Sequence, residues 1–115
     1  MTAATVLSWV TVCPLEHLDR DRGVAALVAG VQVAIFRTTD GLYAIDNLDP
    51  VSGAYVLSRG IVGSRGEVPT VASPLHKQVY DLRTGDCLDL PGVSVARHQI
   101  RCHNGMVEVR LRQEG

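Results

Sequence analysis

Short runs rich in Val, Ile, Leu and aromatic residues, separated by Gly, Pro, Asn and Asp, recur along the whole chain. This spacing is typical of all-β sandwiches and barrels. We therefore expect an all-β, antiparallel fold with a Greek-key arrangement. Strands are expected at residues 9–13, 24–29, 31–38, 42–46, 68–73, 78–82, 96–103 and 106–112.

The clearest alternation of apolar and charged residues lies in the last expected strand. Its apolar residues at 107, 109 and 111 should face the core, and its charged residues at 108, 110 and 112 should face water. Asn104-Gly105 before it is the favoured pair for a two-residue type I′ hairpin, because both central residues need positive φ. Thr39-Asp40-Gly41 predicts another turn, and residues 14–18 predict a single helical turn.

Length and charge exclude several classes of protein. The 115 residues suit one domain, residues 1–115. Eleven Lys and Arg against twelve Asp and Glu, without a long run of either sign, do not predict binding to nucleic acid.

Cys13, Cys87 and Cys102 are too widely spaced for a metal motif, so we expect reduced thiols in or near the core.

Neither an export signal nor a membrane span is apparent. The first five residues lack the basic and apolar regions of a signal peptide. No segment approaches the roughly 18 apolar residues that cross a bilayer. We expect a cytoplasmic protein without a membrane partner.

Residues 47–69 form an irregular region that is too long for a simple connection, since loops above about 12–15 residues are usually functional or disordered. Its apolar residues, Val56, Leu57, Ile61 and Val62, predict an ordered segment. The glycine-rich part, residues 60–66, has neither a phosphate-loop ending nor a dinucleotide-binding spacing. We interpret residues 60–66 as a flexible loop.

Two segments, residues 47–54 and 73–85, resemble the ligand loops of a Rieske iron–sulfur domain. A Rieske centre binds two irons through two Cys and two His, supplied by the family as Cys-x-His-x-Gly and Cys-Pro-x-His-Gly. Pro50, Gly53, Pro74 and Gly85 match the surrounding pattern. The resemblance implies a Rieske-like antiparallel β sandwich or barrel with two cluster-binding-type loops. It assigns the four ligand positions to Asp49, Val51, Ser73 and His76.

Three of these four positions hold unsuitable ligands. Asp49 and Ser73 replace thiolates, and Val51 replaces an imidazole, so only His76 is retained. A neutral Ser hydroxyl is a poor ligand and a Val side chain offers none, so no substitute metal site is expected either. We expect no catalytic, metal or cofactor-binding residue in this chain.

The same loops offer a surface for a partner protein. Lys77 stands where the Rieske pattern has Gly, and its side chain needs room and solvent. We expect His76 at an exposed loop tip. Together with Arg59 and Arg65, His76 and Lys77 are the candidate residues for docking an acidic partner.

Nearly the whole chain is similar to one branch of the Rieske-like group, the small subunit of cytoplasmic NAD(P)H-dependent nitrite reductase. The similarity is marked in residues 9–15, 30–37, 57–63 and 71–78. Departures are small: Val51 stands where an aromatic residue is expected, and Tyr80 where Phe is frequent.

This resemblance implies an accessory, non-redox subunit of an assimilatory enzyme. Its partner would be a large subunit that carries FAD, an iron–sulfur cluster and sirohaem and reduces nitrite to ammonium. Two alternatives were considered. The sequence excludes a Rieske ferredoxin, because electron transfer requires a cofactor and three of the four cluster ligands are missing. A Rieske-like adaptor of a different oxidoreductase system, such as a dioxygenase, would differ only in its partner.

Overall fold

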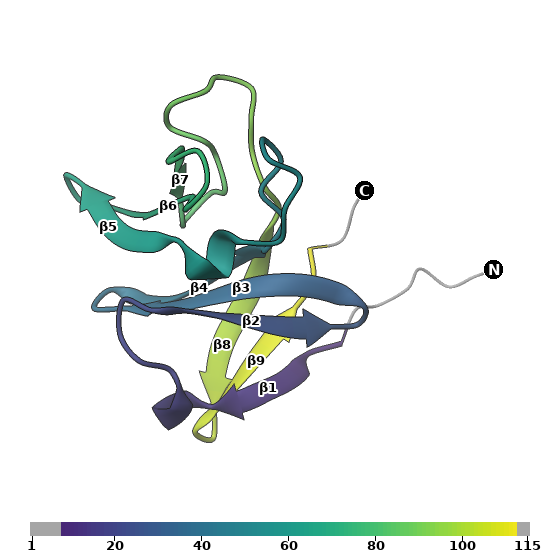
Figure 1. The fold of residues 1–115 in the computed structure, drawn as a ribbon. Helices are drawn as coiled ribbons and strands as arrows, with labels where there is room; N and C mark the ends of the chain where they lie inside the picture. The colour runs from purple at the N-terminus through teal and green to yellow at the C-terminus, as the bar shows by residue number, and fades with distance from the viewer. Residues whose placement is uncertain (1–7, 113–115) are drawn as a thin grey trace.

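Residues 8–112 are described in a computed structural model and form two antiparallel sheets (Figure 1). The expectation about an export signal in residues 1–5 lies outside the described residues. The all-β prediction is confirmed. The strands are β1 Val10–Pro14, β2 Gly23–Val28, β3 Val31–Thr38, β4 Gly41–Asp46, β5 Ile61–Arg65, β6 Val68–Ala72, β7 Val79–Asp81, β8 Arg97–His103 and β9 Met106–Arg110. The large sheet has the order β1-β9-β8-β4-β3-β2, and the small sheet has the order β5-β6-β7.

The helices are single 3₁₀ turns, η1 Leu15–His17 and η2 Leu57–Arg59. η1 confirms the helical turn expected at residues 14–18. Within residues 8–112, no helix has the length and apolar character needed to span a bilayer.

Tight turns join successive strands as the sequence predicts. Asn104 and Gly105 between β8 and β9 have φ values of 52° and 78°, as a type I′ turn requires. Thr39 and Asp40 form the turn between β3 and β4. Val107 and Val109 on β9 are fully buried, which confirms the predicted face. Leu111 follows the strand and is half-buried.

β3 separates two hydrophobic clusters. Val33 and Ile35 pack against other residues of the large sheet, such as Ala44, Val107 and Val109. Ala34 and Phe36 lie on the opposite face of β3 and pack between the two sheets. All four of these β3 side chains are fully buried. Because successive side chains of a strand point to opposite faces, an uninterrupted apolar run is needed here. The small sheet therefore packs against β3 through Ala34 and Phe36.

The interpretation of residues 60–66 as a flexible loop is wrong. Residues 61–65 form β5, which pairs with β6 from Ile61↔Ala72 to Arg65↔Val68. Val62 packs against the cluster between the sheets. Gly60 lies so close to the backbone of Ala72 that a side chain would not fit. The glycine therefore permits close packing.

The cysteines are free, as expected, but they differ in position. Cys87 is buried, Cys13 is half-buried and Cys102 is exposed on β8. Cys102 therefore contradicts the expectation of a core position. Burial raises the pKa of the Cys13 thiol, which keeps it protonated and unreactive.

Candidate functional site

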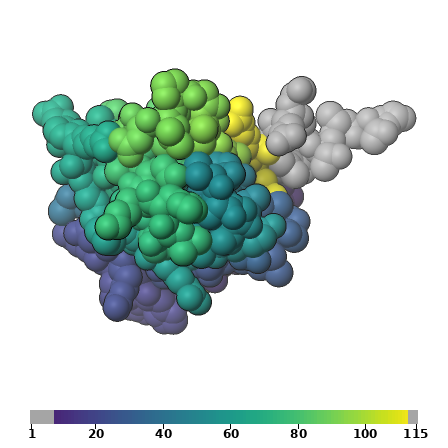
Figure 2. Space-filling model, turned by 45° about the horizontal axis from the view of Figure 1, so that its top comes forward, coloured from purple at the N-terminus to yellow at the C-terminus, as the bar shows by residue number. Residues whose placement is uncertain are grey.

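Two tight loops at one end of the molecule form the candidate site. The first loop, residues 47–56, follows β4, and the second loop, residues 73–78, joins β6 to β7. Figure 2 shows them side by side in teal and green. Each loop is closed by backbone hydrogen bonds: Gly53 N donates to Asp49 O at 2.8 Å, and Lys77 N donates to Ser73 O at 3.0 Å.

The Asp49 carboxylate joins the two loops. Its side chain is fully buried. Oδ2 accepts hydrogen bonds from Ser73 Oγ at 2.6 Å and from Ser52 Oγ at 3.1 Å. Oδ1 accepts hydrogen bonds from Val51 N at 3.0 Å and from Tyr80 Oη at 3.1 Å. A buried carboxylate needs such donors to offset its lost hydration.

Neutral donors keep this carboxylate ionised. Burial by itself raises the pKa of Asp49, but the hydrogen bonds from Ser73, Val51, Ser52 and Tyr80 outweigh it and lower the pKa below its ordinary value. Burial, followed by the Asp49 charge, raises the pKa of Tyr80 well above its ordinary value. The phenol therefore stays protonated and acts as a donor.

The residues at the four ligand positions do not fit a two-iron cluster. Asp49 and Ser73 are in direct contact at 2.6 Å, which leaves no room for an iron bound between them. Both Asp49 oxygens are already occupied by donors. The Val51 side chain is exposed and offers no ligand atom, and His76 is exposed at the tip of the second loop, as expected.

Lys77 has a backbone conformation that normally favours glycine. Its φ is 63°, in the left-handed region that is uncommon for other residues. The Rieske pattern places Gly at this position. The second loop thus has a glycine-type backbone, while the Lys77 side chain lies exposed in solvent as expected.

The candidate docking residues are not equivalent. Arg59, Arg65, His76 and Lys77 are all exposed, but the Arg65 guanidinium is held in an ion pair with Asp89 at 2.8 Å. Asp89 also accepts a hydrogen bond from Val79 N at 2.9 Å. The Arg65 ion pair, followed by the Val79 hydrogen bond, lowers the pKa of Asp89. Arg65 thus connects the end of β5 to the segment that follows β7.

Sequence reasoning missed the apolar character of the loop tips and two members of the hydrogen-bond network. Four large apolar side chains are 36–54% exposed on the loops: Leu48, Val51, Tyr55 and Leu75. The missed network members are Ser52 and Tyr80. The role of Tyr80 could have been predicted from the sequence. A Tyr at a position where Phe is frequent adds a hydroxyl group to a buried strand, and that hydroxyl group needs a hydrogen-bond partner.

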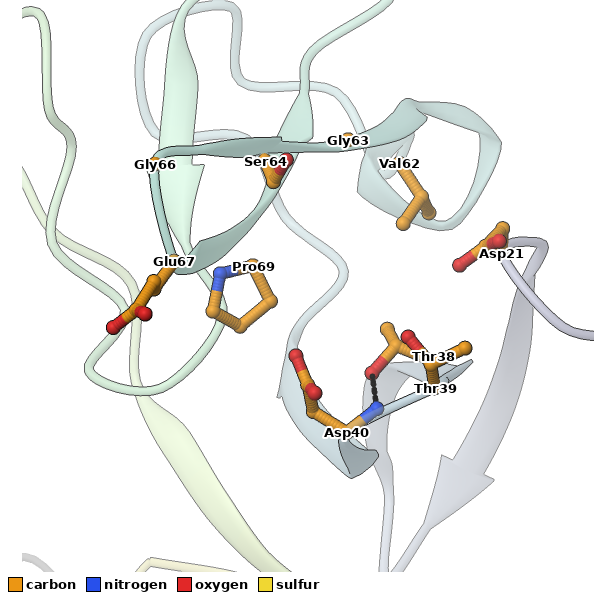
Figure 3. Close-up of a pocket in the computed structure, with 10 residues that line it drawn as sticks. All are labelled: Asp21, Thr38, Thr39, Asp40, Val62, Gly63, Ser64, Gly66, Glu67 and Pro69. Carbon is orange, nitrogen blue, oxygen red and sulfur yellow. Dashed lines mark hydrogen bonds between the residues drawn. The ribbon is translucent and has the colours of Figure 1, made fainter.

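A separate groove of about 360 Å³ lies between the β5–β6 hairpin and the turn that follows β3 (Figure 3). Asp21, Asp40 and Glu67 give its lining three carboxylates. Among residues 8–112, no group of three or more His, Cys, Asp or Glu side chains could hold a metal ion.

A family model described as a Rieske-like [2Fe-2S] domain matches residues 8–110. The chain belongs to this Rieske-like family. A solved member, a crystal structure of an NADH-dependent nitrite reductase small subunit from Mycobacterium tuberculosis, superposes with a TM-score of 0.90. It is 44% identical, and the match covers 96% of this chain and 100% of that chain. The Rieske-like fold predicted from the two loops is therefore confirmed.

Two relatives place the chain within the Rieske-like family. The nitrite reductase (NADH) small subunit of Salmonella typhimurium is 39% identical over 104 residues, which cover 89% of this chain and 96% of that protein. The nitrite reductase [NAD(P)H] large subunit of Klebsiella oxytoca is 40% identical over 105 residues, or 91% of this chain. This chain spans only 11% of the Klebsiella protein. The chain thus belongs to the nitrite reductase small-subunit branch of the family.

Proposed function

We propose that this chain is the accessory, non-redox small subunit of an assimilatory NAD(P)H-dependent nitrite reductase. The observation that carries the proposal is the closed Asp49–Ser73 contact at the ligand positions of a small-subunit homologue. A one-electron carrier needs a cofactor, and the side chains at these positions do not fit the cluster of the Rieske family. The chain therefore contributes binding, and the redox chemistry belongs to its partner.

The partner in this proposal is the large subunit, which reduces nitrite to ammonium in the cytoplasm and holds FAD, an iron–sulfur cluster and sirohaem. The Klebsiella large subunit supports this pairing, because one polypeptide there contains a segment similar to this chain. Covalent joining of two proteins in a relative is expected when the two act together.

The docking surface in this proposal is formed by residues 47–66, which include the first loop, and by residues 73–78 of the second loop. Exposed Leu48, Tyr55 and Leu75 form its apolar part, and Arg59 and Lys77 add positive charge. Contiguous exposed apolar side chains with a polar rim are typical of protein–protein interfaces. The buried Asp49 network holds the two loops in one arrangement and so preforms this surface.

Reconstitution with the large subunit tests the proposal. The purified chain is incubated anaerobically with iron and sulfide, and its iron content and visible spectrum are measured. It is then titrated into its cognate large subunit while nitrite-dependent NAD(P)H oxidation is followed. We expect no bound cluster, saturable binding and a change in turnover.

A stoichiometric two-iron cluster would contradict the non-redox role. Absence of binding to the large subunit would instead favour the alternative, an adaptor of a different oxidoreductase system. Retention of a dioxygenase component by the immobilised chain would then identify that system.

A further inference from the structure

β5 forms one edge of the small sheet, because its only neighbour there is β6. Ile61, Gly63, Ser64 and Arg65 on this strand are exposed. Proteins commonly protect such edges with charged side chains or Pro. The only charged residue of β5 is Arg65 at its end, and its guanidinium is held by Asp89. The middle of the edge is therefore open.

The register shows which backbone groups point outward. In antiparallel pairs, hydrogen-bonded and non-hydrogen-bonded positions alternate. Pro69 has no N–H and its carbonyl accepts a hydrogen bond from Leu82 N at 2.9 Å, on the β7 side. The Ser64↔Pro69 pair is thus a non-hydrogen-bonded position.

By the same alternation, the backbone N–H and C=O groups of Val62 and Ser64 point away from β6. Within residues 8–112, no turn or loop hydrogen bond engages the backbone of Val62 or Ser64. This pattern leaves four backbone groups available to an additional strand.

Two adjoining grooves accompany this edge. One of about 360 Å³ includes Val62, Gly63 and Ser64, and the other, of about 450 Å³, includes Ile61 and Val62. They share Asp21 and Val62. Figure 3 shows the Val62 side chain directed from β5 into the space above the Thr39-Asp40 turn. The carboxylates of Asp21, Asp40 and Glu67 line the groove beside Gly63 and Ser64, whereas Arg22 and Arg59 line the groove beside Ile61. A basic side chain of an added strand would therefore enter the first of these grooves.

We propose that an extended segment of the large subunit adds to the free edge of β5, with a basic side chain directed toward the groove carboxylates. Backbone pairing to an open edge is a common mode of peptide recognition. The carboxylates select a segment containing Lys or Arg through charge complementarity. The identity of the partner rests on the proposed function, whereas the mode of pairing rests on the outward groups of Val62 and Ser64.

Substitution of Ser64 by Pro tests the pairing. The change removes one outward N–H and leaves the β5–β6 hydrogen bonds intact, since Pro is tolerated at outward positions of edge strands. Ser64→Ala, which keeps the N–H, is the matched control. We expect Ser64→Pro to raise the Kd for the large subunit about tenfold relative to Ser64→Ala, as expected for a lost hydrogen bond and its contacts. The thermal midpoints of the two variants should be similar.

Amide hydrogen exchange of the wild-type chain provides a test that does not depend on the variant folding. On binding the large subunit, the amides of Val62 and Ser64 should exchange about tenfold more slowly, whereas the amides of Gly63 and Arg65 already bond to β6. Unchanged exchange at Val62 and Ser64, or equal Kd values for the two variants, would overturn the inference while leaving the proposed function intact. If wild type fails to bind, the proposed function fails. A wild-type homodimer that Ser64→Pro dissociates would identify a second copy as the occupant.

Discussion

Ser73 Oγ donates a 2.6 Å hydrogen bond to the buried Asp49 Oδ2 and thereby joins two loops whose bonded residues lie 24 positions apart. In a Rieske domain the equivalent loops are joined through ligands to a shared cluster. Here a charge-assisted hydrogen bond provides the connection, and bonds to an ionised acceptor are shorter and stronger than neutral ones. Both loops therefore have a fixed arrangement held by protein atoms.

Substitution Asp49→Asn should destabilise the chain by about 2 kcal/mol. The amide replaces one carboxylate oxygen, an ionised acceptor, with an NH₂ group, and this donor would face the hydroxyl donors of the network. Tyr80→Phe, which removes one donor from the same carboxylate, should cost about 1 kcal/mol. Urea unfolding measures both. Ser64→Ala, on the exposed edge of β5, serves as a control and should be neutral. A loss below about 0.5 kcal/mol for Asp49→Asn, the range of ordinary surface changes, would contradict the structural role of the network.

The pH dependence of stability should reflect Asp49. Its pKa is lowered in the folded chain, so the unfolded chain binds its proton first as pH falls. The stabilisation is complete above the unfolded pKa of about 4 and is lost as pH decreases through the folded pKa. The difference in unfolding free energy between wild type and Asp49→Asn should therefore be largest near pH 7 and decrease below about pH 4. A difference that is constant from pH 7 to pH 3 would show that ionisation of Asp49 does not contribute.

Lys77→Gly should stabilise the chain by about 1 kcal/mol, since Lys77 has a left-handed φ of 63° that is costly for residues with a Cβ. Thermal unfolding of Lys77→Gly and Lys77→Ala separates the backbone effect from loss of the charge. We expect only the glycine variant to gain stability. Equal midpoints for the two variants would indicate that the charge, rather than the backbone, determines the effect.

Charge reversal at Arg59 and Lys77 together should raise the Kd for the large subunit about tenfold at low salt through lost electrostatic complementarity. The thermal midpoint should remain close to wild type because both side chains are exposed. A matched double reversal at Arg97 and Arg112, which are exposed outside the proposed docking surface of residues 47–66 and 73–78, gives the same change in net charge. If both double variants bind alike, the loop surface does not provide the specific contact.

The local sequence pattern predicted most of the strands and turns. The features that it did not predict depend on contacts between residues far apart in the sequence. The hairpin at Asn104-Gly105 and the alternation in β9 depend on neighbours in sequence and were recognisable. β5 was not, because Gly60 suggests flexibility until the adjacent backbone of Ala72 is seen.

The candidate site, too, could be predicted from the sequence only in part. The loop positions were predicted from their pattern, as was the exposure of His76 and Lys77. The Asp49–Tyr80 hydrogen bond spans 31 positions, and the Arg65–Asp89 ion pair spans 24. Neither has a local signature, so only the folded chain reveals which polar groups are already engaged.

The burial of β3 on both faces affects how the chain can open. Ala34 and Phe36 form part of the wall beneath the small sheet, and Val33 and Ile35 line the interior of the large sheet. Detachment of the small sheet would expose Ala34 and Phe36 to water, and opening of the large sheet would expose Val33 and Ile35. Each event removes support from the other, since both depend on one strand. The two sheets are therefore expected to melt as a single cooperative unit, with the amides of β3 the last to exchange.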